Sequence, residues 1–113
     1  MLDLARAGAD IKAGVSFHGV YDAPPFPNAM MTASLLVCHG WNDPLCPPDA
    51  TVGLANELTA AGIDWQLHAY GHTGHAFTAN DVPMDADKTF GFQPDTDRRS
   101  WKSMTDFLAE KLG

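Results

Sequence analysis

A short apolar run at residues 34–40, Ser-Leu-Leu-Val-Cys-His-Gly, constrains the fold more than any other part of this sequence. Its four consecutive apolar residues leave no polar face, which is typical of a strand buried on both sides in a parallel sheet. The turn-forming sequence Trp-Asn-Asp-Pro follows at once. Because a parallel sheet needs helices on both faces, we expect strands and helices to alternate along the chain.

The other segments fit this pattern. Residues 13–19 are short, apolar and bounded by glycine, and residues 64–70 have the composition of a third strand. Gly62 is placed to end a helix at 48–61, and an apolar face at helical spacing begins at Asp97, which we expect to be the N-cap. The elements expected in chain order are the end of a helix at 2–9, strands at 13–19 and 34–40, a helix at 48–61, a strand at 64–70 and a helix from Asp97 onward. We therefore predict an α/β fold, a parallel three-stranded sheet flanked by helices, with every strand buried on both faces.

Length and charge limit the classes of function. With 113 residues the chain forms one domain at most, residues 1–113, and its 45% hydrophobic content is ordinary for a globular protein. Its 14 acidic residues against 7 basic ones give a net charge of −7, which disfavours nucleic acid and anionic membrane surfaces as partners. There is no apolar run of membrane-spanning length, no signal-peptide pattern at the N-terminus, and only two cysteines. We therefore expect a cytoplasmic domain.

Two candidate catalytic residues follow predicted strands. Asp43 comes three residues after the strand at 34–40, and His75 follows the strand at 64–70 in a glycine-rich turn. In open parallel sheets, catalytic groups gather at the carboxyl ends of the strands. A carboxylate beside a histidine fixes the imidazole tautomer and stabilises the imidazolium that forms during proton transfer. An acid and then a histidine on successive strand ends are, in order, the last two members of an α/β-hydrolase triad.

Other interpretations of these residues stay open at this point. Asp43 is also a suitable Asx-turn residue before a proline, and His75 alone is compatible with a surface loop. His72 and His75, with Cys38 or Cys46, suggest a zinc site, but the two cysteines are too far apart in the sequence for the paired ligands of structural zinc. We therefore expect neither a metal nor another cofactor.

Four segments lie in order along the chain: 15–19 (VSFHG), 37–44 (VCHGWNDP), 74–78 (GHAFT) and 97–101 (DRRSW). Together they resemble the C-terminal half of the dienelactone hydrolase family, over nearly the whole chain. The resemblance implies an α/β-hydrolase fold with a cysteine or serine nucleophile. It also implies that Asp43 and His75 are the acid and base that serve this nucleophile.

The sequence departs from the family pattern in two places. The family's Gly-x-Cys/Ser-x-Gly elbow, which carries the nucleophile, does not occur in these residues; the nearest imitation places Ser16 before a glycine that comes one position too late. Cys46 is the only cysteine that we consider as a substitute nucleophile. The resemblance also implies an arginine four residues after the histidine in members that act on dienelactone, and that position is Ala79 here. Alanine cannot hold a substrate carboxylate.

These observations lead to two hypotheses of different classes. The first is the C-terminal half of a dienelactone-hydrolase-like esterase, acting on a small-molecule ester or lactone, in which Asp43 and His75 are catalytic. The alternative is an inactive remnant or interaction module that lacks the nucleophile. The resemblance implies that the strand at 13–19 pairs with a strand that these residues lack, so that its edge is unpaired. We therefore predict a homo-oligomer or pairing with a complementing N-terminal hydrolase fragment.

Overall fold

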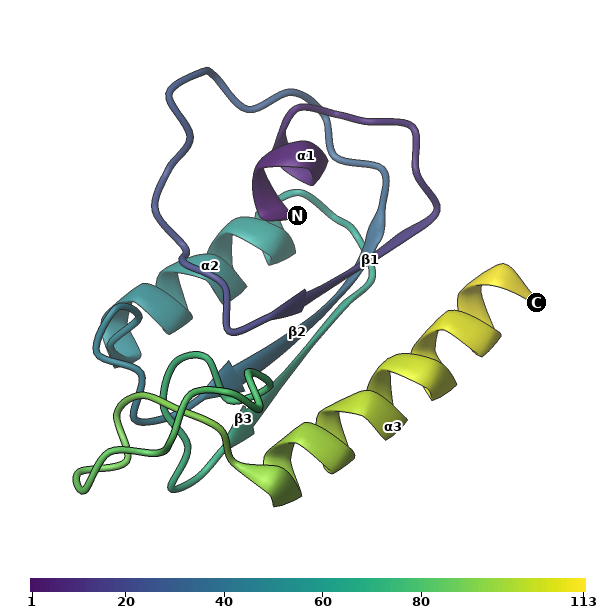
Figure 1. Ribbon diagram of the computed structural model, residues 1–113. Helices are drawn as coiled ribbons and strands as arrows, with labels where there is room; N and C mark the ends of the chain where they lie inside the picture. The colour runs from purple at the N-terminus through teal and green to yellow at the C-terminus, as the bar shows by residue number, and fades with distance from the viewer.

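The computed structural model describes residues 1–113 and contains a parallel sheet of three strands in the order β1-β2-β3 (Figure 1). The elements are α1 (Leu2–Arg6), β1 (Ala13–Phe17), β2 (Ser34–Gly40), α2 (Pro48–Ala60), β3 (Trp65–Tyr70) and α3 (Pro94–Leu112). The predicted α/β architecture and the central strand at 34–40 are confirmed. Gly62 takes a left-handed φ of 73° just beyond α2, as expected for the residue that ends a helix.

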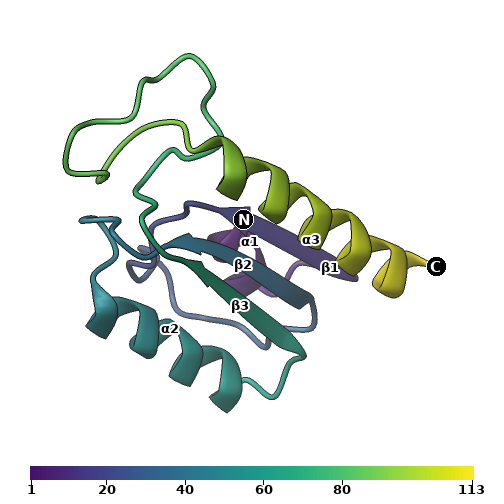
Figure 2. The same cartoon turned by 90° about the horizontal axis from the view of Figure 1, so that it is seen from below.

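Helices cover both faces of the sheet, with α3 on one side and α1 and α2 on the other (Figure 2). Side chains of β2 alternate between two apolar cores: Leu35 and Val37 pack with α1 and α2, whereas Leu36 and Cys38 pack with α3. The buried Arg6 links α1 to α2, because its guanidinium donates to both carboxylate oxygens of Glu57, at 2.8 and 2.7 Å. Both faces of β2 are therefore covered.

The outer strands are less buried than predicted. Every residue of β3 is exposed or only partly buried, so the prediction of burial on both faces is wrong for this strand. The reason is its place at the edge of the sheet, paired only with β2. At the other edge, β1 has Gly14 and Ser16 buried, and it also pairs only with β2. Each outer strand thus has one side without a strand partner.

The start of α3 also differs from the prediction. The helix begins at Pro94 rather than after Asp97, and Gln93 is its N-cap. The Gln93 side chain accepts a 2.9 Å hydrogen bond from the backbone N–H of Asp95. Proline suits the first position of a helix because its missing N–H has no helical partner there. Asp97 therefore lies in the first turn of α3.

All three strands run in the same direction, so their carboxyl ends lie at one end of the sheet (Figure 1). The loops that follow β1, β2 and β3 leave the sheet at this end, and two of them carry Asp43 and His75. None of the helices is both long and apolar enough to cross a membrane.

Candidate active site

Asp43 is held in the tight turn that follows β2. Its backbone N–H donates to the carbonyl oxygen of Gly40 at 3.0 Å, and its Oδ1 accepts the backbone N–H of Leu45 at 2.9 Å. Asp43 is thus the Asx-turn residue that the sequence allows, and its side chain is fully buried. One carboxylate oxygen shapes the turn, and the other is left to bind a second group.

His75 is that second group. Its Nδ1 lies 2.7 Å from Oδ2 of Asp43. Because a carboxylate only accepts hydrogen bonds, His75 donates to Asp43 through Nδ1–H, and Nε2 is the nitrogen that Asp43 does not bind. The side chain of His75 is 20% exposed, whereas that of Asp43 is inaccessible. The arrangement therefore gives an oriented imidazole that is reachable from solvent and backed by a buried carboxylate.

Two glycines allow close backbone contacts around this pair, Gly40 between the two turns and Gly74 between the His75 turn and the loop before α3. A Cβ added at Gly40 would lie 2.3 Å from the carbonyl oxygen of Gly74, and one added at Gly74 would lie 2.1 Å from the backbone of Thr89. The N–H of Asn42 donates to the carbonyl oxygen of Thr73 at 2.8 Å and joins the two turns directly. Asp43 and His75 are thus brought together by backbone contact.

The loop between β3 and α3 folds back onto His75. Residues Thr89 and Gly91 bracket its backbone: the N–H of His75 donates to the carbonyl oxygen of Thr89 at 2.8 Å, and the N–H of Gly91 donates to that of His75 at 2.9 Å. The loop is closed on itself farther out, because the N–H of Phe92 donates to the carbonyl oxygen of Val82 at 2.8 Å. The backbone of the candidate base is therefore fixed on both sides.

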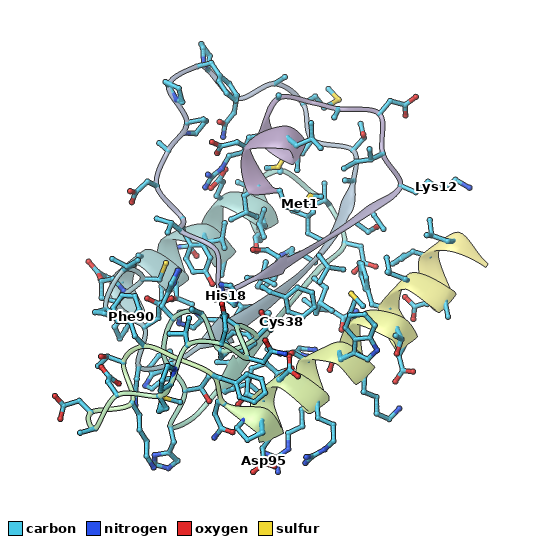
Figure 3. The ribbon with its side chains drawn as sticks, in the orientation of Figure 1. Met1, Lys12, His18, Cys38, Phe90 and Asp95 are labelled. Atoms are coloured by element: carbon cyan, nitrogen blue, oxygen red, sulfur yellow. The ribbon has the colours of Figure 1, made fainter.

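Two aromatic rings flank the imidazole of His75. The ring of Phe90 meets it edge to face with centroids 5.5 Å apart, and the ring of His18 does so at 5.3 Å. His18 follows β1, and Phe90 lies in the loop before α3; both are labelled in Figure 3. Phe90 is 40% exposed, so it contributes an apolar wall beside the candidate base. Neither residue was predicted from the sequence to be part of the site.

Behind the site, a buried histidine joins two further segments. Nδ1 of His39 lies 3.0 Å from the hydroxyl of Tyr21, and its Nε2 lies 3.2 Å from the hydroxyl of Thr51 in the first turn of α2. Burial lowers the pKa of His39, so the ring is neutral at physiological pH. His39 thus connects the segment after β1 with α2 and takes no part in the solvent-accessible face of the site.

Neither cysteine is activated as a nucleophile. The thiol of Cys46 is buried in the core and donates to the carbonyl oxygen of Gly19 at 3.2 Å. Burial raises the pKa of the Cys46 thiol, and it raises that of Cys38 to about 11. A nucleophilic cysteine needs a lowered pKa. Both thiols therefore have the properties of structural cysteines.

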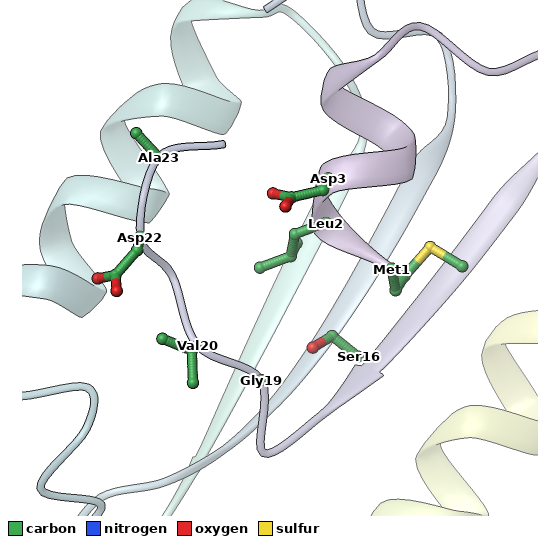
Figure 4. Close-up of a pocket in the computed structure, with 8 residues that line it drawn as sticks. All are labelled: Met1, Leu2, Asp3, Ser16, Gly19, Val20, Asp22 and Ala23. Carbon is green, nitrogen blue, oxygen red and sulfur yellow. The ribbon is translucent and has the colours of Figure 1, made fainter. Parts of the chain in front are cut away.

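Ser16 faces a separate cavity of about 300 Å³ between α1 and the segment that follows β1 (Figure 4). Met1 and Leu2 line one side, and Gly19 and Val20 line the other. Neither Asp43 nor His75 lines this cavity. Ser16 is part of the regular strand β1, without the sharp strand-to-helix turn of a nucleophile elbow.

His72 lies on the surface in a left-handed conformation, with φ of 55°. No three histidine, cysteine, aspartate or glutamate side chains converge as metal ligands would. The spacing that suggested zinc therefore does not correspond to a cluster in space.

The chain is similar to several known proteins. A profile of the dienelactone hydrolase family matches residues 1–112. An uncharacterised protein of Caenorhabditis elegans is 30% identical over 113 residues, which is 96% of this chain and 71% of that protein. Among solved structures, a dienelactone-hydrolase-like promiscuous phosphotriesterase from metagenomic libraries is 30% identical with a TM-score of 0.80, and a protein called m3DLH is 34% identical with a TM-score of 0.82. Each of these two matches covers 97% of this chain and 46% of the solved one, so the chain spans about half the length of these structural relatives.

Proposed function

This chain belongs to the dienelactone hydrolase family, and we propose from that premise that Asp43 and His75 are the acid and base of a triad that hydrolyses a carboxylic ester or lactone. The observation that carries the proposal is the 2.7 Å hydrogen bond between Nδ1 of His75 and the buried carboxylate of Asp43. Exposed ion pairs form readily on protein surfaces, but a buried carboxylate with one oxygen in a turn and the other on an imidazole is oriented for proton transfer.

In this proposal, Nε2 of His75 takes the proton of a cysteine or serine nucleophile as that group attacks the ester carbonyl. The same proton then passes from Nε2 to the leaving oxygen, and an acyl-enzyme remains. A water molecule, deprotonated by the same nitrogen, attacks the acyl group. The bond between the acyl group and the nucleophile then breaks, the carboxylic acid leaves, and Nε2 returns its proton to the nucleophile. Asp43 keeps the proton on Nδ1 throughout and stabilises the imidazolium that forms in each half of the reaction.

The proposed substrate is an uncharged ester or lactone. Ala79 offers no hydrogen-bond donor to a substrate carboxylate, and the half-exposed ring of Phe90 gives the site an apolar wall. The net charge of −7 also disfavours anionic substrates over the surface as a whole.

We propose that the nucleophile is supplied by a segment outside these 113 residues, because Cys38, Cys46 and Ser16 all lack the required setting. The free edge of β1 is where such a segment would add a strand. A complementing hydrolase fragment and a second copy of the chain are the two partners that this edge suits. An interaction module without activity is the alternative, and the same experiment separates the two.

The test is the hydrolysis of p-nitrophenyl acetate by the chain alone and by the chain mixed with the N-terminal half of m3DLH. The chain alone should hydrolyse the ester near the uncatalysed rate, since a general base by itself adds at most about 10²–10⁴-fold. The mixture should show turnover that His75→Gln abolishes and that Asp43→Asn lowers by about 10⁴-fold. His68→Gln, on the α3 side of β3, is the matched control and should leave turnover unchanged.

The same variants can be tested with a phosphotriester, because one structural relative is described as a promiscuous phosphotriesterase. Turnover that survives His75→Gln would contradict the proposed role of the base. A mixture in which the two parts bind each other without any turnover would favour the interaction module. Turnover by the chain alone that disappears in Cys46→Ala would identify Cys46 as the nucleophile and refute the proposed source of that group.

A further inference from the structure

His18 has an unusual backbone for its position. It directly follows β1 and has a left-handed φ of 39°, a region that residues with a side chain seldom occupy. Its backbone N–H still donates to the carbonyl oxygen of Cys38 at 3.0 Å, which continues the pairing of β1 with β2 by one residue. Unfavourable backbone conformations of this kind persist where the surrounding contacts enforce them, and they concentrate at functional sites.

The side chain of His18 is held by the turn that carries His75. Nε2 of His18 lies 2.8 Å from the hydroxyl of Thr78, three residues after His75. The ring also packs edge to face against Phe77, with centroids 5.1 Å apart. In the same turn, Ala76 has a left-handed φ of 59°. One side chain at the end of β1 thus contacts three of the four residues from His75 to Thr78.

The ring of His18 is also uncharged beside the candidate base. Burial lowers the pKa of His18, and positive charge on His75 lowers it further, while Asp43 acts in the opposite direction. From α3, Asp97 lines a small cavity with Thr78 and Phe17, at the other end of the bond that holds His18. At physiological pH the neighbour of His75 is therefore a neutral ring.

We propose that His18 is a positioning residue for His75: through Thr78 it fixes the turn 75–78, and its ring packs against the imidazole that takes up the proton. The inference rests on the proposed function, because it gives His75 the part of the base. A charged residue at this place would repel the imidazolium. Without the bond to Thr78, the turn would lose its side-chain hydrogen bond to the end of β1, and the ring of His18 would no longer be fixed beside that of His75.

The test uses nitrogen and proton NMR of the histidine side chains in the full chain. The Nδ1–H proton of His75, shielded by its bond to Asp43, should exchange slowly with water in the parent protein. His18→Phe keeps the aromatic volume and removes the bond to Thr78, and Thr78→Val removes the same bond from the other side. Each should accelerate the exchange of that proton at least tenfold, and Thr78→Ser should restore the slow rate.

Two further measurements separate this role from general packing. His68→Phe makes the same chemical change on β3, away from His75, and should leave the exchange rate as it is in the parent. The pKa of His18 should lie below the usual value of about 6.5 and should rise in His75→Gln, which removes the neighbouring positive charge.

The outcomes distinguish this inference from the proposed function. Slow exchange in His18→Phe and Thr78→Val as well as in the parent would overturn the positioning role and leave the Asp43–His75 pair intact. Acceleration by His68→Phe to the same degree would overturn it too, since the effect would then be general loosening. Absence of the slow Nδ1–H proton from the parent itself would overturn the proposed function and the inference together.

Discussion

Replacing Gly40 with alanine tests how the two turns of the site are held together. The added Cβ would lie 2.3 Å from the carbonyl oxygen of Gly74 and 2.7 Å from that of Thr73. Both oxygens belong to the backbone, so neither can rotate away as the end of a side chain would. Overpacking costs about 1–3 kcal/mol, and these fixed contacts place Gly40→Ala at the upper end. The reduced freedom of the unfolded chain offsets about 0.4–1 kcal/mol, which leaves a net loss of about 2 kcal/mol.

The free energy of unfolding can be measured by urea denaturation. With a slope of about 1–3 kcal/mol per molar urea for small proteins, the midpoint should fall by about 1 M. Gly53→Ala is the matched control, because Gly53 lies inside α2 and nothing lies within 4 Å of its added Cβ. That variant should be more stable than the parent by about 0.5–1 kcal/mol, from helix propensity alone.

Gly40→Ala should also have a local effect at the site. If the turns separate to accommodate the methyl group, the bond between Asp43 and His75 should weaken, and its Nδ1–H proton should exchange faster. A midpoint for Gly40→Ala equal to that of the parent, with unchanged exchange, would refute the view that close backbone contact at Gly40 sets the position of the pair.

Three other predictions concern stability and assembly. Glu57→Ala should lower the free energy of unfolding by about 2 kcal/mol, because buried Arg6 loses its bidentate partner but keeps its bonds to two backbone carbonyls. Asp106→Ala, which removes an exposed ion pair, should lower it by less than about 1 kcal/mol. Equal losses in the two variants would contradict this prediction. Stability should be full above about pH 6.5 and should fall as the pH drops below this value. Burial lowers the pKa of His18 and His39 in the folded state, so the unfolded chain binds more protons at lower pH. Urea midpoints at about pH 7.5 and about pH 5.5 measure the difference, and equal midpoints would contradict the prediction. The free edge of β1 should make the chain associate at micromolar concentration, and a compact, cooperatively melting monomer in light scattering would argue against that expectation.

The sequence was sufficient for the parts of the site that depend on strand ends. Asp43 and His75 follow neighbouring parallel strands, and parallel strands bring their carboxyl ends to one edge of the sheet, so their proximity was predictable. The buried central strand at 34–40 was predictable for a similar reason, because its apolar residues leave no face for water. Both conclusions need only local patterns and the geometry of a parallel sheet.

The remainder depends on contacts that no local pattern encodes. Phe90 lies fifteen residues beyond His75 and reaches it only because the intervening loop folds back. The part played by His18 depends on Thr78, a residue sixty positions away. The incomplete burial of β3 likewise depends on how much of the strand α2 and α3 cover, which its six residues do not specify. One signal was available in the sequence for His18. It also directly follows a predicted strand, and the carboxyl end of that strand lies at the same end of the sheet as Asp43 and His75.

The self-closed loop beyond His75 separates the position of the His75 backbone from the exposed rim beside it, so that evolution or design can change the two independently. The turn at its tip, where the N–H of Lys88 donates to the carbonyl oxygen of Asp85 at 3.1 Å, is exposed and directly precedes Thr89, which binds the backbone of His75. Exposed turn tips are the places that best tolerate inserted residues. Residues inserted between Asp85 and Lys88 would therefore change what the rim presents to an arriving molecule, while Thr89 and Gly91 keep their bonds to the backbone of His75. The loop thus offers a region in which the rim can diversify without a change in the Asp43–His75 pair.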